Sequence, residues 1–230
     1  AVAAGLVMAL LHAAVTVSGR VDQIVSGVAL NILSYGLNRF FGYRIFNMAA
    51  SSPDVPGLPE ISAGGATLSW IVPFAFVLAG LSWLILTRTG FGLRLQAVGE
   101  NPAAADAAGI SVPALRYAGV LLGGAFAGLA GAYLSIEHTG MYVEGMTQGK
   151  GFIALAALIV GNWNPFGLFG ASLLFGLFEA MSFRLVQSQT LPYQFVQMAP
   201  YLLTLAVLAG LRGKTRAPAA TGQNWSREET

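Results

Sequence analysis

The sequence predicts an all-α membrane protein, a polytopic bundle of transmembrane helices. Of its 230 residues 55% are hydrophobic and only 10% are charged, whereas soluble domains carry about 25% charged residues. The 29 glycines and 10 prolines stand inside long apolar runs, as they often do in transmembrane helices. A bilayer is therefore the expected surroundings of most of the chain.

Composition also excludes several classes of function. Cysteine is absent, which rules out disulfides, thiol catalysis and cysteine-based metal sites. The formal net charge is +2, but the basic residues are scattered between apolar runs, so we expect no binding to nucleic acid. The chain opens inside an apolar run without the charged region of a signal peptide, and we expect a missing N-terminal piece.

The apolar runs predict the spans in order. A hydrocarbon core about 30 Å thick requires about 20 apolar residues in a helix. One further segment, residues 151–161, is too short alone and could be a short span or a re-entrant half-helix. It reaches full length if it extends upstream through residues 145–149, with Lys150 in a protein-lined interior or snorkelling outward. The long spans are expected near residues 1–17, 23–46, 68–87, 115–136, 165–183 and 195–212.

The basic residues predict the orientation, because Lys and Arg are retained on the cytoplasmic side. Arg88, Arg94 and Arg116 bracket a loop at 88–115, and further basic residues crowd a tail at 213–230. If both face the cytoplasm, the short segment must cross, and seven crossings are expected within residues 1–212. The same topology places residues 18–22 inside and the 47–67 loop outside.

The cytoplasmic loop contains the residues that begin and end a helix. Asn101 is a favourable N-cap, Pro102 fits the first helical position, and Gly109 suits the left-handed residue after the end. The resulting helix, residues 102–108, is about 10 Å long and is marginal in water unless something packs against it. Its alanine surface would let another protein approach closely. The helix is either a docking element for another protein or a connector at the membrane interface, in which alanine serves only to favour the helical conformation.

Three segments carry a family resemblance. The run G-x-x-L-x-A-V-G-x-N-P-x-A-A-x-x-A-G-I, within residues 90–113, resembles the cytoplasmic coupling loop of ABC importer permeases for ribose, nucleosides and branched-chain amino acids. Residues 22–36 (DQIVSGVALNILSYG) and 151–180 (GFIALAALIVGNWNPFGLFGASLLFGLFEA) are similar to two other segments of that family. The resemblance is strongest to nucleoside or simple-sugar permeases. Asn162 follows Gly161 where the family pattern often has a basic residue.

The resemblance implies how the chain is driven and with what it assembles. The loop would sit in a cleft of an ABC ATPase subunit, which uses ATP and Mg, while the chain itself binds no cofactor. A second homologous permease, with a heterodimer favoured over a homodimer, and an extracytoplasmic substrate-binding lipoprotein would complete the complex in a bacterial inner membrane. The C-terminus would be cytoplasmic. The implied coupling residues are Gly99, Glu100, Asn101, Pro102, Ala104, Ala105 and Gly109.

Polar and small residues inside the predicted spans are candidates for a translocation pathway. Asn31 lies mid-span between Gly27 and Gly36, where an amide needs a hydrogen-bond partner or a water-filled path. Glu179 either lines the pathway or pairs with a residue such as Arg184. Small residues spaced by four along 119–131 make one helix face smooth, which suits either static packing or sliding during gating.

The leading interpretation is a permease subunit of an ABC importer that moves nucleosides or simple sugars by alternating access. The sequence contains neither a G-x-x-x-x-G-K-[ST] phosphate loop nor a catalytic or metal constellation, so we do not expect it to hydrolyse ATP. The alternatives are a branched-chain amino acid permease and an ion-coupled secondary transporter or channel. A membrane enzyme is the least favoured.

Overall fold

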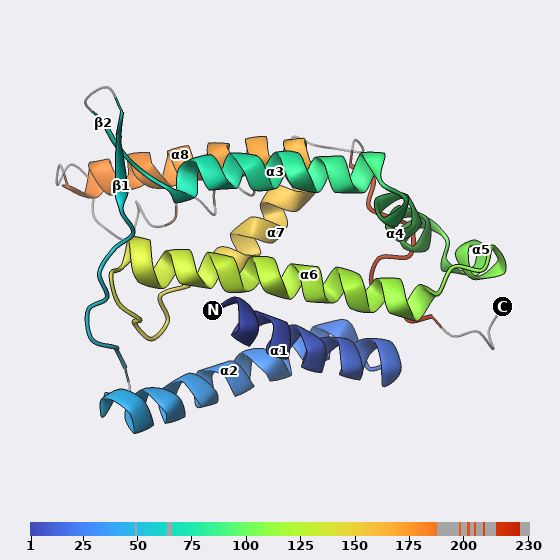
Figure 1. Cartoon of the computed structure of the whole chain (residues 1–230), viewed down its shortest axis with the longest axis horizontal. Coiled ribbons are helices and arrows are strands. Elements are labelled where there is room, and N and C mark those ends of the chain that lie inside the picture. The colour runs from blue at the N-terminus through green and yellow to red at the C-terminus, as the bar shows by residue number, and fades with distance from the viewer. Residues whose placement is uncertain are drawn as a thin grey trace. The chain divides into compact units, whose positions relative to one another are not determined.

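The computed structural model describes residues 1–48, 50–63, 66–187 and 215–225, together with Met198, Leu202, Leu205 and Ala209 (Figure 1). The predicted span at 195–212 therefore lies largely outside the described residues. Contacts divide the chain into two units. Unit 1 comprises residues 1–74, 89–147 and 218–230, and unit 2 comprises residues 75–88 and 148–217.

Helices dominate the described residues, which confirms the all-α prediction apart from one small β-hairpin. Two helices continue into short π-helical stretches, η1 and η2, and the hairpin lies in the loop predicted to be outside. Unit 1 contains α1 (Val2–Ala13), η1 (Ala14–Ser18), α2 (Gln23–Phe46), β1 (Glu60–Ala63), β2 (Ala66–Ser69), α4 (Gly90–Glu100), α5 (Pro102–Ala107), α6 (Val112–Ala132) and η2 (Tyr133–His138).

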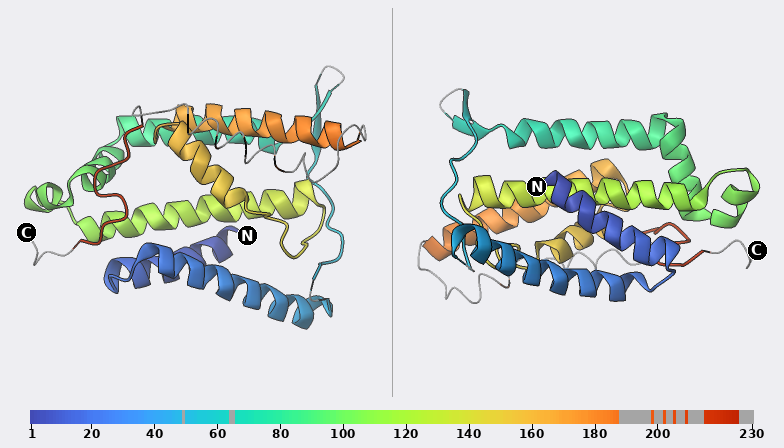
Figure 2. Two further views of the ribbon diagram at one scale, coloured as in Figure 1. Left: turned by 180° about the vertical axis from the view of Figure 1, so that it is seen from behind. Right: turned by 60° about the horizontal axis from the view of Figure 1, so that its bottom comes forward.

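Helices α1 and α6 lie side by side (Figure 2), and small residues form their contact. A Cβ added at Gly124 would lie 2.3 Å from the Cβ of Ala9 and 2.7 Å from the carbonyl oxygen of Gly5. A Cβ at Gly128 would be similarly crowded, whereas one at Gly123 would meet nothing within 4 Å. Close backbone approach through small residues is a common way to pack transmembrane helices. Gly124 and Gly128 therefore form the close contact with α1, whereas a Cβ at Gly123 or Gly131, in the predicted stripe of small residues, would meet nothing within 4 Å. Static packing and sliding during gating both stay predictions for that stripe.

The loops of unit 1 gather at the two ends of α6 in the groups that the topology predicts. At one end, the amide of Ser52 donates to the carbonyl oxygen of Tyr142 at 2.9 Å, so the 47–67 loop, predicted to be outside, meets the loop after η2 there. At the other end, the hydroxyls of Ser18 and Tyr117 share a hydrogen bond of 2.7 Å, which joins the 18–22 loop to the start of α6. We call these the outer end and the coupling end.

Unit 2 is organised around a tight helical hairpin. It contains most of α3 (Ile71–Arg88), with α7 (Lys150–Val160) and α8 (Pro165–Gln187). A Cβ at Gly167 would lie 2.2 Å from the carbonyl oxygen of Gly161, so only glycine allows this turn. The hairpin buries a cluster formed by Ala156, Ala157, Ala171 and Phe175.

The number of qualifying spans is lower than predicted. Within the described ranges, three helices are both long enough and apolar enough to cross a bilayer, at Ile71–Arg88, Val112–His138 and Pro165–Ser182. Seven crossings were expected. The stretch Val2–Ser18 is apolar but shorter, and α2 has 24 residues but contains polar residues such as Asn38 and Arg39.

The proposed extension of α7 is wrong. Residues 145–149 form turns, because Gly145, Gln148 and Gly149 have φ values of +78°, +42° and +75°, which a right-handed helix cannot contain. The helix begins at Lys150 and has 11 residues. At 1.5 Å per residue it is about 16 Å long, which is about half of the hydrocarbon core.

Candidate functional site

The coupling end of unit 1 is built around α5, whose boundaries follow the expected residues closely. The Asn101 side-chain oxygen accepts a hydrogen bond from the amide of Ala104 at 3.0 Å, so the N-cap prediction is confirmed. Pro102 is the first helical residue. Gly109 has φ +80°, as expected of a left-handed residue past a helix end. The helix ends at Ala107, one residue earlier than predicted.

An apolar cluster holds α5 against its neighbours. Val98 of α4, Ala105 of α5 and Val112 at the start of α6 are 3%, 4% and 0% exposed. Ile110, Leu115 and Trp225 pack against them. A six-residue helix is too short to be stable alone in water, and this cluster supplies the packing that it needs. We call Val98, Ala105 and Val112 the joint cluster.

The coupling residues expected from the sequence fall into three groups by exposure. Ala105 is buried in the joint cluster, and Gly99 and Pro102 are partly buried. The remaining ones are exposed, and one of them, Ala104, forms with Ala107 and Ala108 an outward face of small side chains on α5. The exposed expected residues are Glu100, Asn101, Ala104 and Gly109. The structure thus brings the set together at one place but turns only part of it outward.

A C-terminal segment, residues 218–225, lies over the joint between α4 and α5 (Figures 1 and 2). The amide of Ala220 donates to the carbonyl oxygen of Gly99 at 2.9 Å. The amide of Ala219 donates to a carboxylate oxygen of Glu100 at 3.4 Å. Two of the expected coupling residues therefore contact the chain's own tail.

The same segment is anchored at two further places. The Arg116 guanidinium on α6 donates to the carbonyl oxygen of Gln223 at 2.8 Å, and the Asn224 side-chain amide donates to the carbonyl oxygen of Arg20 at 2.7 Å. Trp225 packs on the joint cluster. The sequence analysis did not single out Trp225, although a lone tryptophan in a polar tail is a signal that could have identified it.

A cavity of about 550 Å³ opens beside this segment. Its lining comes from η1, the loop after it, the connection between α5 and α6, and Trp225. Arg20, Arg116 and Asp106 contribute charged groups to it. The connection from α5 to α6 is therefore not packed tightly against η1.

The pathway candidates on α2 lie away from packed surfaces of unit 1. Asn31 and Gly36 are exposed and Gly27 is partly buried. A Cβ at either glycine would meet nothing within 4 Å. Both alternatives for Asn31, lining a water-filled path and hydrogen bonding to another protein surface, therefore stay predictions.

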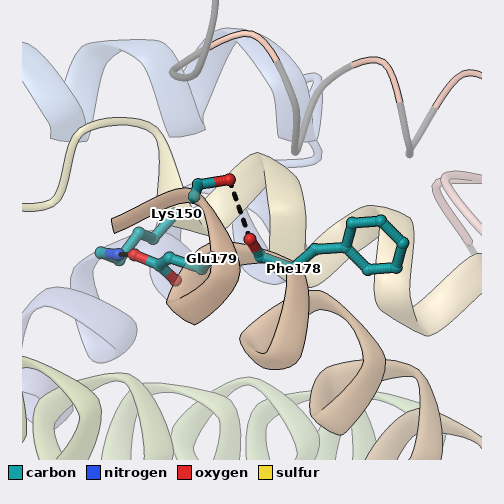
Figure 3. A network of polar contacts seen from close by, with 4 residues as sticks. Lys150, Phe178 and Glu179 are labelled. Atoms are coloured by element: carbon teal, nitrogen blue, oxygen red, sulfur yellow. Dashed lines mark hydrogen bonds and ion pairs between the residues drawn. The ribbon is translucent and has the colours of Figure 1, made fainter. Parts of the chain in front are cut away.

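The carboxylate of Glu179, on α8, pairs with the Lys150 ammonium at the start of α7 (Figure 3). Their side chains are 38% and 30% exposed. The sequence suggested Arg184 as a pairing residue for Glu179. In the structure the partner of Glu179 is Lys150 instead. Pairing offsets the cost of placing either charge at membrane depth. A pathway role for Glu179 stays a prediction.

The comparison with known families decides what kind of protein this is. The family described as "Branched-chain amino acid transport system / permease component" matches residues 1–208. The chain belongs to this permease family. No group of three or more His, Asp or Glu that could hold a metal occurs in the part of the permease that the structure describes.

The relatives of the permease are subunits of ABC transporters. It is 40% identical to the guanosine ABC transporter permease protein NupQ of Bacillus subtilis and 42% identical to the nucleoside ABC transporter permease protein NupC of Lactococcus lactis, each match covering 96% of this chain and 74% of the relative. It is 32% identical to a putative glucose ABC transporter permease protein of Haloferax volcanii, over 99% of this chain and 79% of the relative. No solved structure matches the permease significantly.

Proposed function

We propose that this permease imports nucleosides, driven by a separate ATPase subunit that docks on the exposed face of α5. The observation that carries the proposal is the outward face of small side chains on a capped helix, held by the joint cluster. Small residues let a partner approach the helix backbone closely. The substrates in the names of the two bacterial relatives, guanosine and nucleosides, favour nucleosides over simple sugars, with branched-chain amino acids third.

The joint cluster explains how a movement of the ATPase would reach the membrane. Ala105 on α5 and Val112 at the start of α6 are buried in the same cluster. A displacement of α5 therefore displaces the start of α6, because close-packed interiors transmit strain. The helix with its η2 continuation spans 27 residues, about 40 Å. Its tight contact with α1 at Gly124 would move both helices together during alternating access.

The proposed assembly contains three kinds of partner, the ATPase and two others. The ATPase supplies ATP and Mg chemistry at the coupling end, so the permease needs no cofactor of its own. A second, homologous permease, in a heterodimer, would cover exposed apolar faces such as that of α2. A substrate-binding lipoprotein would meet the outer end. The coupling end and the C-terminus would then face the cytoplasm of a bacterial cell.

Uptake in the native host tests the proposal. The gene is deleted and restored, and entry of radiolabelled guanosine, ribose and leucine is measured. We expect deletion to abolish the guanosine uptake that this route carries and to leave leucine uptake unchanged. Restored uptake should survive an ionophore but fail on ATP depletion. Loss of leucine uptake alone, or sensitivity to the ionophore alone, would overturn the proposal.

A further inference from the structure

We propose that the C-terminal segment, residues 218–225, is part of the coupling apparatus, with Trp225 as its positioning residue. The segment fixes α5 to α4 and α6, so that a push on α5 moves all three elements as one body. This inference rests on the proposed docking of an ATPase at α5, and goes beyond it by assigning a role to the tail.

The segment closes the joint between α4 and α5 with backbone contacts. The Gly99 carbonyl lies in the last turn of α4, where carbonyl groups lack helical partners, and the Ala220 amide satisfies it at 2.9 Å. A Cβ added at Gly99 would lie 3.5 Å from the Cβ of Pro218, which is ordinary van der Waals contact. The tail therefore lies directly against the residue at which the chain turns from α4 towards α5.

The segment also ties this joint to α6 and to the loop after η1. Arg116 stands one turn into α6 and reaches the carbonyl of Gln223. Asn224 reaches the carbonyl of Arg20 in the loop after η1. A segment of eight residues thus joins α4, α6 and the loop after η1. Such a brace resists rotation of α5 relative to α6.

Trp225 provides the packing part of the brace. It contacts the joint cluster on the side where the 550 Å³ cavity leaves α5 without support from η1. Its indole nitrogen is buried and has no hydrogen-bond partner among the described residues. The side chain therefore acts through its apolar surface, and another aromatic ring can replace it.

A set of three variants of the complete transporter, reconstituted in proteoliposomes, tests this role. Trp225→Ala removes the packing, Trp225→Phe keeps an aromatic ring, and Thr221→Ala removes a hydroxyl that bonds only within the tail, to Pro218. The readout is substrate moved per ATP hydrolysed, at equal amounts of assembled complex. A tail that only aids folding would change the amount of complex and leave this ratio unchanged.

We expect Trp225→Ala to lower the ratio by about fivefold or more, the lower end of typical coupling between sites. Trp225→Phe and Thr221→Ala should stay within about twofold of the parent. An unchanged or increased ratio in Trp225→Ala would overturn the proposal. If the parent itself shows no ATP-driven uptake, the proposed function fails, and this outcome differs from failure of the tail's role.

A cross-link tests the position of the tail without using activity. The chain has no cysteine, and the 3.5 Å separation at Gly99 and Pro218 falls within the Cβ to Cβ range of a disulfide. The double variant Gly99→Cys with Pro218→Cys should form a reversible cross-link in oxidised membranes. Each single variant is the control. Absence of the cross-link in assembled complex would show that the tail does not lie on the joint and would overturn the proposal.

Discussion

The two ends of unit 1 are held together in different ways. At the coupling end, apolar side chains from three helices meet in the joint cluster, and the tail braces it. At the outer end, the contacts are hydrogen bonds between loops and one exposed ion pair, Arg39 with Glu144 at 3.6 Å. None of residues 139–149 is buried. Segments with few buried apolar contacts open most easily, so the coupling end is suited to transmit force and the outer end to rearrange.

Tyr142, in the loop at the outer end, has a raised phenol pKa. Burial, then the charge of Glu144, then Tyr35 raise the pKa of Tyr142 above its ordinary value of 10.0. A raised pKa favours the neutral phenol, so Tyr142 stays uncharged at neutral pH. Ionisation of Tyr142 therefore does not alter the outer loops near pH 7.

The largest expected effect is at the exposed face of α5. Ala104→Trp should reduce substrate uptake by about tenfold or more, because a bulky ring keeps the ATPase from the helix backbone, and a loss of 1.4 kcal/mol already gives a factor of ten. Ala104→Ser, which stays small, should retain uptake. The measurement is uptake together with recovery of the ATPase on the purified permease. Normal uptake in Ala104→Trp, with normal membrane insertion, would show that α5 is not the docking site.

The next effect is on the helix pair between the two ends. Gly124→Ala places a methyl group 2.3 Å from Ala9, and overpacking of this kind costs about 1–3 kcal/mol. Gly123→Ala is the matched control, because its Cβ would meet nothing within 4 Å. We expect Gly124→Ala to lower the melting temperature and the folded yield in detergent, and Gly123→Ala to change neither. Equal behaviour of the two variants would argue against the α1 and α6 contact.

The difference between local signals and contacts of distant segments explains what the sequence could predict. The boundaries of α5 depend on signals a few residues apart, such as Asn101, Pro102 and Gly109, and these were predicted within one residue. The apolar runs likewise predicted the long helices of unit 1, α1, α2 and α6, but not α4, which lies within the predicted loop at 88–115. Pairing between distant segments leaves no such local pattern. The contact of Trp225 with the joint cluster, and that of Lys150 with Glu179, therefore had to come from the structure.

The errors in the sequence analysis have a related cause. The orientation predicted from the basic residues required this segment to cross the membrane and so favoured lengthening α7 upstream, but left-handed residues at Gly145 and Gly149 make the helix begin at Lys150. Glycine is compatible with a transmembrane helix and with a turn, so composition could not choose between them. The burial of Ala105 was also missed. Apart from Pro102, every residue of α5 is alanine or aspartate, so no apolar periodicity marks an inner face.

A smaller effect is expected from the cap of α5. Asn101→Ala removes the hydrogen bond to the Ala104 amide, and loss of an N-cap costs about 1 kcal/mol. Asn101→Asp keeps an equivalent acceptor and is the control. We expect faster hydrogen exchange at the Ala104 amide and a reduction in uptake of a few fold in the alanine variant only. If both variants exchange alike, the cap does not stabilise α5.

The smallest effect is expected at the outer end, from Glu144→Gln. This change removes the ion pair with Arg39, whose side chain is 61% exposed, and exposed pairs contribute about 0–1 kcal/mol. Thermal stability should fall slightly at low salt and not at all at high salt, because salt screens exposed charges. Arg39→Gln and the double variant complete a mutant cycle that isolates the pair. A coupling energy as large as the cost of Gly124→Ala would mean that the outer end is held as firmly as the rest of unit 1, and the contrast between its two ends would fail.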